Sequence, residues 1–353
     1  MNTHISMNTG EYRQLVIETV REETKDFKTF SFRDGHHLKY EAGQFITLVD
    51  FIGTREIRRS YSIVSSPVLE EPLSIGVKRI DNGFFSRKLF DKTLPGDLLT
   101  TIGVSGFFKL PENIKFFNSI FFFAAGSGIS PILSLIKTTL YAHPKISVYL
   151  IYSNTTPENT AYIRLLKQLE KDFRGRFTID FLFSTASDLR KARLNSDRIL
   201  ELLLIHTANL EKSLFYICGP ESYMRLVIFL LIEEGFPNEH IKKEDFNPGN
   251  RKLSLKLPAD KNNYEVQLKT NEKNYSFTIH YPDTILQAAK KLKFNLPYSC
   301  ETGKCGTCVA RCLHGIVWMS NNEVLTDHEL SNGLILTCTG HPQSSGVVLE
   351  IGL

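Results

Sequence analysis

The first hundred residues alternate short apolar stretches with polar turns. Six stretches rich in β-branched and aromatic residues recur with turn signals between them, which is typical of strands joined by tight turns. The pattern predicts a small antiparallel β-barrel. The expected strands are Tyr12–Thr19, Phe27–Phe32, Gln44–Asp50, Arg58–Val64, Leu73–Arg79 and Asp97–Gly103.

The middle of the chain opens with a continuous apolar run, Ser119–Ala125, followed by the turn Gly126-Ser-Gly128 and a helix. A helix N-terminus after a glycine turn can bind a pyrophosphate. We expect Ser130 to cap this helix and Pro131 to occupy its first turn. Because Pro131 replaces the third glycine of GxGxxG, a purely structural turn is an equal alternative. One helical face carries Ile132, Leu135, Ile136 and Leu140.

Strands and helices keep alternating to about residue 246, which predicts a parallel sheet covered on both faces. Ligands bind beyond the carboxyl ends of such strands, where Gly126-Ser-Gly128 and Cys218-Gly219-Pro220 both lie. The two loops are therefore expected to converge on one crevice. The expected strands are Ile146–Tyr152, Phe177–Phe183, Leu214–Cys218 and His240–Phe246, and the expected helices are Thr160–Glu170, Arg198–Leu204 and Tyr223–Glu234.

The C-terminal part of the chain shows a third pattern. Tyr264–Thr270 and Asn274–Tyr281 alternate like the two strands of a hairpin around Asn271-Glu-Lys. Asp283 or Thr284 can cap a helix that runs through Lys293. The inward side chains of that helix are Ile285, Ala288, Ala289 and Leu292. A hairpin followed by a helix and a loop predicts an α+β domain of the β-grasp type.

Four of the six cysteines show the spacing of a plant-type ferredoxin, C-x4-C-x2-C with a fourth after 29 residues. They are Cys300, Cys305, Cys308 and Cys338. A [2Fe-2S] cluster needs four thiolates around one small rhomb, so three must come from one curled loop. Gly303 and Gly306 can take the backbone angles that such a loop requires. The alternatives are a zinc knuckle and a disulfide set. Cys218 and Cys312 fall outside the pattern.

Composition narrows the class of protein. A chain of 353 residues with 42% hydrophobic residues exceeds one ordinary core and predicts two or three domains. The net charge of +4, without a long basic run, argues against nucleic-acid binding. No apolar run approaches the roughly 18 residues of a membrane span. Six cysteines, four of them expected to bind metal, fit the reducing cytoplasm.

These patterns predict a multidomain chain. We expect an antiparallel β-barrel domain at residues 9–112 and an α/β parallel-sheet domain at 113–248. A mobile linker is expected at 249–263, because that segment is rich in Asn, Pro, Lys and Gly. The β-grasp ferredoxin domain would occupy residues 264–353.

One barrel strand carries a candidate ligand site. Arg59-Ser60-Tyr61-Ser62 places a cation, a flat ring and a hydroxyl together, which suits a phosphorylated ring system. An exposed Arg/Tyr ladder is the commoner explanation of such a motif in isolation. The histidines are scattered and form no set with a carboxylate that would bind an oxygen-activating iron.

Five motifs, in this order, resemble the ferredoxin–NADP reductase superfamily over Glu11–Phe246, with a plant-type ferredoxin fused behind it. They are Arg59-Ser60-Tyr61-Ser62, Gly76-Val77-Lys78-Arg79, Gly83-Phe84-Phe85-Ser86, Gly126-Ser-Gly128-Ile-Ser-Pro131 and Cys218-Gly219-Pro220. The domain order is similar to that of the reductase components that serve epoxygenases and hydroxylases.

The resemblance implies a flavin domain and a role for each of its residues. Arg59 would hold the flavin phosphates, with Tyr61 against the isoalloxazine and Ser62 near its N5. The remaining flavin-dinucleotide contacts would be Val77, Lys78, Arg79, Gly83 and Ser86. FAD is expected rather than FMN, because FMN-containing relatives share the domain order but differ at these positions.

The resemblance also implies a nicotinamide domain. Gly126, Gly128 and Pro131 would carry the dinucleotide, and Cys218, Gly219 and Pro220 would lie beside the nicotinamide. Glu244 and Phe246 match a Glu-x-Phe ending in which the ring covers the flavin, although a Phe at the end of a strand is usually a core residue. The catalytic residues would be Ser62, Cys218 and Glu244.

The nicotinamide cofactor stays open between NADPH and NADH. Relatives often place an arginine for the 2′-phosphate where this chain has Thr155. Arg164 or Arg193 could replace it, yet each is more commonly a solvated charge. No acidic residue that would bind an adenosine ribose follows the strand.

The expected activity is the conversion of a two-electron donor into single electrons, from NAD(P)H through FAD and the [2Fe-2S] cluster to a partner protein. The partner would be an oxygenase, hydroxylase or desaturase. Two alternatives stay open: a non-enzymatic iron–sulfur redox sensor or scaffold, and a reductase of another metal-cluster protein. The identity and substrate of the partner, the cluster potential and the oligomeric state are not readable from the sequence.

Overall fold

The computed structural model describes residues 12–34, 38–53, 55–188, 192–206, 209–246, 257–269, 274–294 and 296–351. The chain divides into two compact units, Met1–Lys242 and Lys243–Leu353. Residues 249–256 of the predicted linker lie outside the described residues, as does the hairpin turn at 271–273. Among the described residues, no helix combines the length and the apolar content that crossing a membrane requires.

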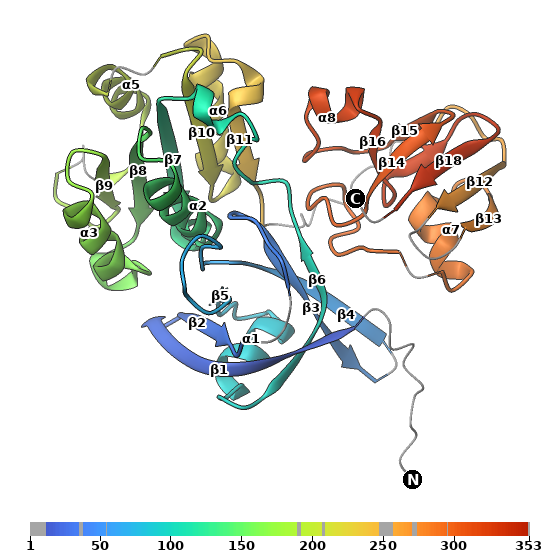
Figure 1. Ribbon diagram of the computed structural model, residues 1–353, viewed down its shortest axis with the longest axis horizontal. Helices are drawn as coiled ribbons and strands as arrows, with labels where there is room; N and C mark the ends of the chain where they lie inside the picture. The colour runs from blue at the N-terminus through green and yellow to red at the C-terminus, as the bar shows by residue number, and fades with distance from the viewer. Residues whose placement is uncertain are drawn as a thin grey trace. The chain divides into compact units, whose positions relative to one another are not determined.

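The first unit begins with the predicted antiparallel barrel, drawn in blue to cyan in Figure 1. Its strands run in the order β4-β3-β6-β1-β2-β5, and a bridge between Ile63 and Ile75 joins the two outer strands. The strands are β1 (Arg13–Thr24), β2 (Phe27–Phe32), β3 (Phe45–Ile52), β4 (Arg55–Ser62), β5 (Ser74–Lys78) and β6 (Leu98–Ser105). A core that includes Phe30, Phe32 and Ile46 fills the barrel.

Strand β1 extends five residues beyond its predicted end at Thr19. The run Arg21-Glu22-Glu23-Thr24 has no apolar alternation, so the pattern predicts no strand there. Cross-strand pairing with β2 extends it instead, with Val20 opposite Phe30 and Thr24 opposite Phe27. Helix α1 (Phe84–Lys92) follows β5 and buries Phe85, Leu89 and Phe90 on one side. Gly83 is the residue that precedes its first turn.

The second half of this unit is the predicted parallel sheet. Its strand order is β11-β10-β7-β8-β9, and β10, β7, β8 and β9 pair in parallel. The strands are β7 (Ser119–Ala125), β8 (Ser147–Asn154), β9 (Phe177–Phe183), β10 (Ser213–Cys218) and β11 (Ile241–Glu244). The helices are α2 (Ile129–Ala142), α3 (Ile163–Asp172), α5 (Ser196–Ile205) and α6 (Glu221–Glu233).

Successive residues of β7 belong to different cores. Ile120 and Phe122 pack with residues of α2 and α3, whereas Phe121 and Phe123 pack with residues of α5 and α6. A strand points alternate side chains to opposite faces, so this division confirms that helices cover both faces of the sheet.

Three details of this sheet differ from the predictions. Helix α2 is preceded by Gly128 without a side-chain cap, and the Ser130 hydroxyl donates instead to the Ser127 carbonyl. Pro131 does lie in the first turn, as predicted. Helix α3 begins at Ile163, because residues 157–159 form a 3-10 turn capped by Thr156. Strand β11 ends at Glu244, two residues before Phe246.

The second unit contains a mixed sheet with the order β13-β12-β18-β14-β16. Strands β12 (Tyr264–Lys269) and β13 (Asn274–Ile279) form the predicted antiparallel hairpin, and β12 pairs in parallel with β18 (Val347–Glu350). Helix α7 (Ile285–Lys291) begins at a capping box between Thr284 and Gln287, so Thr284 and not Asp283 is the cap. The remaining elements are β14 (Val309–His314), β15 (Val317–Met319), α8 (Asp327–Ser331), β16 (Leu334–Leu336) and β17 (Gly340–Pro342).

Candidate functional site

The four cysteines of the ferredoxin spacing come together in the second unit. Three lie in the loop before β14, and Cys338 lies just after β16. The thiols of Cys300 and Cys305 hydrogen-bond to each other, and Cys308 hydrogen-bonds to Cys338. Cys312 lies on β14 instead, where its thiol donates to the His314 carbonyl at 3.3 Å. The structure therefore separates the four-thiol set from the extra thiol.

This pairing fits a two-iron cluster. Hydrogen bonding from Cys305 lowers the pKa of the Cys300 thiol to about 5, and the same contact raises the pKa of Cys305. Within the described part of the chain, no three His, Cys, Asp or Glu side chains lie together in an arrangement that would hold a single metal ion. A [2Fe-2S] rhomb takes two thiolates per iron, which two pairs of thiols can provide.

The cluster loop uses its glycines as predicted. Gly303 has φ +79° and Gly306 has φ +73°, angles that favour glycine. A Cβ on Gly303 would lie 2.7 Å from the Asn321 carbonyl oxygen, so the loop also needs the space. The Thr302 amide donates to the Cys300 sulfur at 3.4 Å. Such amide contacts to the sulfurs help to set cluster potentials.

Sequence reasoning missed one feature of this loop. Lys304 stands between Gly303 and the ligand Cys305, and its Nζ lies 3.0 Å from Asp245 and 3.6 Å from Glu323. Its side chain is largely buried. A lysine between two ligand positions was the available signal, but its acidic partners are distant in sequence.

In the barrel, the Arg59-Ser60-Tyr61-Ser62 motif lies at the end of β4. Arg59 is exposed, Tyr61 is half-buried against Phe85, and Ser62 is buried. The neighbouring Arg58 is buried and bound by Glu56, which also accepts from the Tyr12 hydroxyl. Of the two adjacent arginines, Arg59 is therefore the one placed to meet a ligand.

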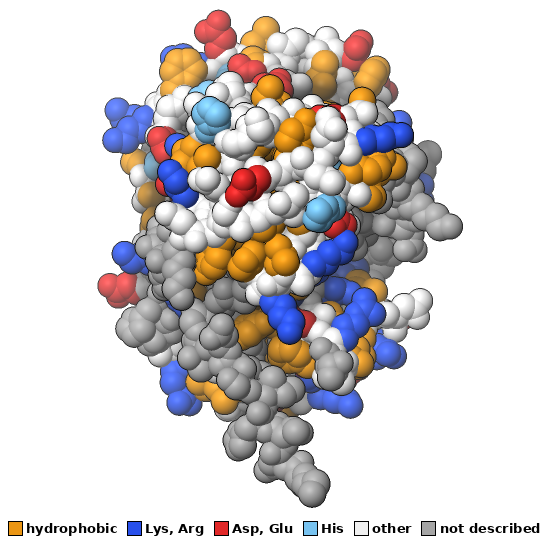
Figure 2. All heavy atoms as spheres, turned by 90° about the vertical axis from the view of Figure 1, so that its right-hand side faces the viewer, with side chains coloured by type: hydrophobic (Ala, Val, Ile, Leu, Met, Phe, Trp, Pro, Cys, Tyr) orange, Lys and Arg blue, Asp and Glu red, His pale blue; other side chains and the backbone are white. Residues whose placement is uncertain are grey.

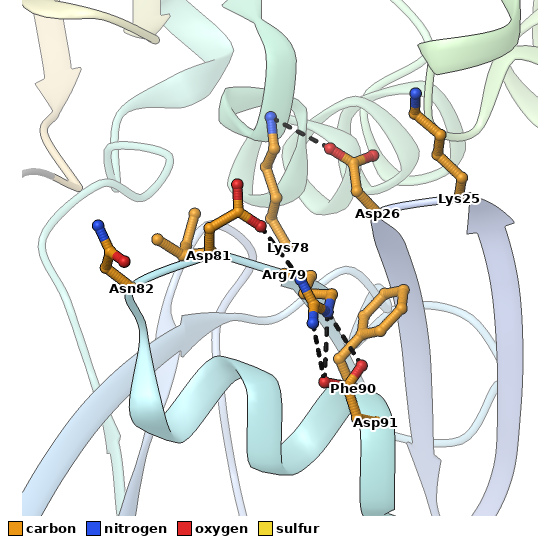
Figure 3. A pocket seen from close by; sticks show the side chains of 9 residues that line it. Lys25, Asp26, Lys78, Arg79, Asp81, Asn82, Phe90 and Asp91 are labelled. Carbon is orange, nitrogen blue, oxygen red and sulfur yellow. Dashed lines mark hydrogen bonds and ion pairs between the residues drawn. The ribbon is translucent and has the colours of Figure 1, made fainter.

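The residues predicted to bind the rest of the flavin dinucleotide lie on β5, on α1 and in the turn between them. Figure 3 shows an open pocket of about 790 Å³ beside them, lined by Lys78 and Arg79 among others. Lys78 points to Asp26 at 3.7 Å. The Arg79 guanidinium is held by Asp91 at 3.0 Å and by Asp81 at 3.1 Å, so its donors are already engaged.

The other three members of this group are Val77, Gly83 and Ser86. Val77 is buried in the barrel core, and Gly83 lies at the start of α1. The Ser86 hydroxyl accepts from the Ile80 amide at 3.2 Å and donates to the Gly83 carbonyl. A Cβ on Gly83 would lie 2.5 Å from that hydroxyl. A side chain at position 83 would therefore displace the Ser86 hydroxyl.

The two loops of the parallel sheet meet as predicted. A Cβ on Gly128 would lie 2.0 Å from the Cys218 carbonyl oxygen, and a Cβ on Gly219 would lie 2.9 Å from the Ala125 Cβ. Gly126 has φ +54° with open space around its Cα, and Pro131 follows in the first turn of α2. Cys218 is buried, and Pro220 precedes α6.

Glu244 is the last residue of β11, and Phe246 follows two residues later. The Glu244 Oε2 is shielded from solvent and has no hydrogen-bond partner among the described residues. Burial raises the pKa of Glu244 to about 8, so this carboxyl is mainly protonated at neutral pH. Phe246 is 44% exposed, so it is not a core residue.

The region expected to choose between NADPH and NADH is uncharged at its centre. Thr155 is exposed directly after β8, and its carbonyl accepts from the Thr185 hydroxyl at 2.9 Å. Arg164 and Arg193 are both exposed. Figure 2 draws a different face, the right-hand side of Figure 1, on which basic, acidic and apolar side chains are interspersed.

Comparisons with known proteins agree with this arrangement. Residues 14–110 match the oxidoreductase FAD-binding domain, residues 122–228 the oxidoreductase NAD-binding domain, and residues 268–343 the 2Fe-2S iron-sulfur cluster binding domain. The chain is 31% identical to one of the subunits of the 1,2-phenylacetyl-CoA epoxidase of Escherichia coli K12, over 96% of this chain and 97% of that protein.

Further relatives cover the chain to a similar extent. The ferredoxin reductase component of 3-ketosteroid-9-alpha-monooxygenase from Rhodococcus rhodochrous is 28% identical over 95% of this chain and 96% of its own. The structure of phthalate dioxygenase reductase matches with a TM-score of 0.59 and 23% identity, over 97% of this chain and 98% of that one. An intact type IV self-sufficient cytochrome P450 monooxygenase matches with a TM-score of 0.71 and 19% identity, over 97% of this chain and 41% of that one.

The barrel, the parallel sheet and the paired thiols define a reductase that joins flavin, nicotinamide and iron–sulfur domains in one chain. The chain belongs to the ferredoxin–NADP reductase superfamily, in the branch with a C-terminal [2Fe-2S] ferredoxin domain. It is an NAD(P)H-dependent oxidoreductase, and its cofactors are FAD, a [2Fe-2S] cluster and a nicotinamide dinucleotide.

Proposed function

We propose that this chain is the reductase component of an oxygenase system and that its acceptor is an oxygenase or hydroxylase. The observation that carries the proposal is the paired set of four thiols, which shares one chain with a flavin barrel and a nucleotide sheet. Full-length similarity to a component of an epoxidase and to a monooxygenase reductase component supports the oxygenase as acceptor. When bound, FAD accepts an electron pair with a hydride, and the cluster carries one electron at a time.

The barrel residues have the chemistry to hold FAD. The exposed Arg59 offers a planar guanidinium to a phosphate, and the half-buried ring of Tyr61 offers a flat surface. Ser62 offers a buried hydroxyl as a hydrogen-bond partner. The engaged guanidinium of Arg79 leaves Lys78 as the freer cation of its strand, because the Lys78 contact with Asp26 is longer and exposed.

The nucleotide residues would orient the nicotinamide and control protons near it. Gly128 and the Cys218 carbonyl are in close contact, which holds the two loops together at the carboxyl ends of β7 and β10. The protonated Glu244 can donate a hydrogen bond where an ionised carboxylate could only accept one. Ser62, Cys218 and Glu244 are accordingly the proposed catalytic residues, and Phe246 the proposed cover of the flavin.

The domain limits at 112/113, 248/249 and 263/264 stay predictions. We also propose that the protein acts in the cytoplasm, because thiolate ligands persist in a reducing compartment. The electron donor is NADH or NADPH. Thr155 itself is an uncharged residue that cannot select the 2′-phosphate by charge, so a direct comparison of both nucleotides is needed.

The test is an anaerobic titration of the purified protein with NADH and, separately, with NADPH. Visible absorption follows the flavin, and low-temperature EPR follows the cluster. We expect the flavin bands to bleach and a rhombic reduced [2Fe-2S] signal to appear, with the faster nucleotide identifying the donor. A protein without flavin, or a cluster that stays oxidised with both nucleotides, would instead indicate an iron–sulfur sensor.

Matched cysteine variants sharpen this test. Cys338→Ser removes one thiol of a pair, so we expect flavin reduction without the EPR signal. Cys312→Ser changes a thiol outside the set and should retain both. Oxygen consumption that appears only when an oxygenase component is added supports the proposed acceptor. Electron delivery to another metal-cluster protein, without oxygen consumption, contradicts it.

A further inference from the structure

Helix α2 buries a polar side as well as an apolar one. Every residue from Ile129 to Leu140 is buried. Its apolar side chains join the core beneath the parallel sheet, whereas three polar ones contact the barrel loop 63–73. These three are Ser134, Lys137 and Thr138. The outer face of a helix is normally solvated, so a covered polar face needs a partner for each group.

The loop 63–73 provides these partners. The Ser134 hydroxyl donates to the Ser65 carbonyl at 2.5 Å, and the hydroxyls of Thr138 and Ser66 lie 2.7 Å apart. The Lys137 Nζ lies 2.6 Å from the Glu71 Oε1, and the Lys137 side chain is only 7% exposed. We call this set of contacts the α2 seam.

Glu71 binds the loop as well as the helix. Its Oε1 also accepts from the Ser66 amide at 2.6 Å. The Ser65 hydroxyl accepts from Tyr40 and from the Ser74 amide, so the loop is held from both sides. Burial lowers the pKa of Lys137, and the facing Glu71 opposes that shift. The seam is thus a connected polar network inside the first unit.

The seam joins the two chain segments that follow the proposed binding motifs. Loop 63–73 begins directly after Ser62, the last residue of the flavin motif on β4. Helix α2 begins directly after Gly128, the end of the nucleotide turn. Nearer that turn, a Cβ on Gly76 would lie 2.9 Å from the Ser130 hydroxyl, so β5 also touches α2 closely. A shift of the seam would therefore move one motif against the other.

We propose that Lys137 and Glu71 are positioning residues for hydride transfer, because they fix the position of the nucleotide turn relative to the flavin motif. This inference rests on the proposed function. The charged pair is chosen over the hydroxyl contacts because removing Glu71 leaves the buried Lys137 charge without its partner, whereas removing Lys137 leaves Glu71, whose side chain is 32% exposed, with only the Ser66 amide. The geometry of the remaining partners then has to change.

The test compares full-length Lys137→Met and Glu71→Gln with a matched control. Lys109→Met removes an ion pair of the same 2.6 Å length to Glu41, but one whose side chains are 39% and 59% exposed. Stopped-flow measurements give the limiting rate of flavin reduction at saturating nucleotide and the nucleotide Kd. Reduction of the flavin by dithionite, which does not depend on how a nucleotide is positioned, is measured as well. Hydrogen exchange of residues 63–73 and 129–142 supplies a readout that does not depend on activity.

We expect the limiting rate to fall about 10- to 100-fold in both variants, since misplacement by about 1 Å costs that much. Dithionite reduction, FAD content and cluster content should match the wild type, as should every rate of Lys109→Met. Amide exchange should rise in both seam segments. Lys137→Arg keeps the charge and should recover most of the rate.

Two results would overturn the inference. One is a limiting rate within twofold of the wild type in both seam variants, even if they unfold more easily, because the pair would then be merely structural. The other is loss of FAD in proportion to the loss of rate. If the wild type is reduced by neither nucleotide, the proposed function fails instead, so the two failures are distinguishable.

Discussion

Replacing Gly128 by alanine tests whether the two loops of the nucleotide site must touch. The added Cβ would lie 2.0 Å from the Cys218 carbonyl oxygen and 2.5 Å from its carbon, both backbone atoms. The Gly128 backbone has φ −60° and ψ −13°, which alanine adopts freely. The substitution therefore acts through steric overlap alone and adds no backbone strain.

The magnitude follows from that overlap. Ordinary contacts of a Cβ begin at 3.4 Å, so the turn and the Cys218 loop must separate by about 1.4 Å (3.4 minus 2.0). Overpacking of this kind costs roughly 1–3 kcal/mol of stability. A displacement of about 1 Å at a reacting site lowers the rate about 100-fold, equivalent to ~2.7 kcal/mol. We expect kcat/KM for the nicotinamide substrate to fall by about that factor.

The assay is steady-state ferricyanide reduction with NADH or NADPH, together with urea unfolding. Gly175→Ala is the control: this glycine has φ +84° and no heavy atom within 4 Å of a built Cβ. It should lose about 1–2 kcal/mol through backbone strain and keep its rate, which separates lost stability from displaced loops. The reasoning is refuted if Gly128→Ala retains kcat/KM within threefold of the wild type with full FAD content.

Two further predictions concern Glu244 and the cluster loop. Because burial raises the pKa of Glu244 from 4.5 to about 8, the folded protein retains a proton that the unfolded chain loses, and stability should fall as pH rises from about 4.5 to 8. Urea unfolding should show that the free energy of unfolding of the wild type is roughly 1–2 kcal/mol lower at pH 8.5 than at pH 6, a value reduced to allow for partial exposure of the side chain. Glu244→Gln should abolish this difference. An equal loss in the variant would contradict the prediction. Gly303→Ala places a Cβ 2.7 Å from the Asn321 carbonyl oxygen at φ +79°, so iron and sulfide content should drop while FAD stays. Gly346→Asn is the control and should keep the cluster, because this glycine has φ +68° and the nearest atom to a built Cβ lies at 3.7 Å. A normal iron content in Gly303→Ala would show that the loop tolerates the side chain.

Three arginines differ in their partners and exposure in a way that the sequence does not indicate. Arg58, Arg59 and Arg79 have the same chemistry in the sequence, yet Arg58 is held by Glu56 and Arg79 by Asp91 and Asp81. Only the packing of strands leaves Arg59 exposed at the end of β4. The polar residues of α2 are a second example, because nothing in the sequence indicates that Ser134, Lys137 and Thr138 lie buried against the barrel.

Features that depend on neighbours along the chain could be predicted from the sequence. Cysteine spacing and loop glycines predicted the cluster loop, and the periods of apolar residues predicted a barrel, a doubly covered parallel sheet and a β-grasp domain. The convergence of the two glycine loops and of the four cysteines could also be predicted from motifs. The individual contacts emerged only in the folded chain: the close approach of Gly128 to the Cys218 carbonyl, the pairing of Cys308 with Cys338, and the ion pair between Lys137 and Glu71. The difference arises because local patterns set backbone conformation and burial, whereas packing of remote elements decides which polar groups find partners.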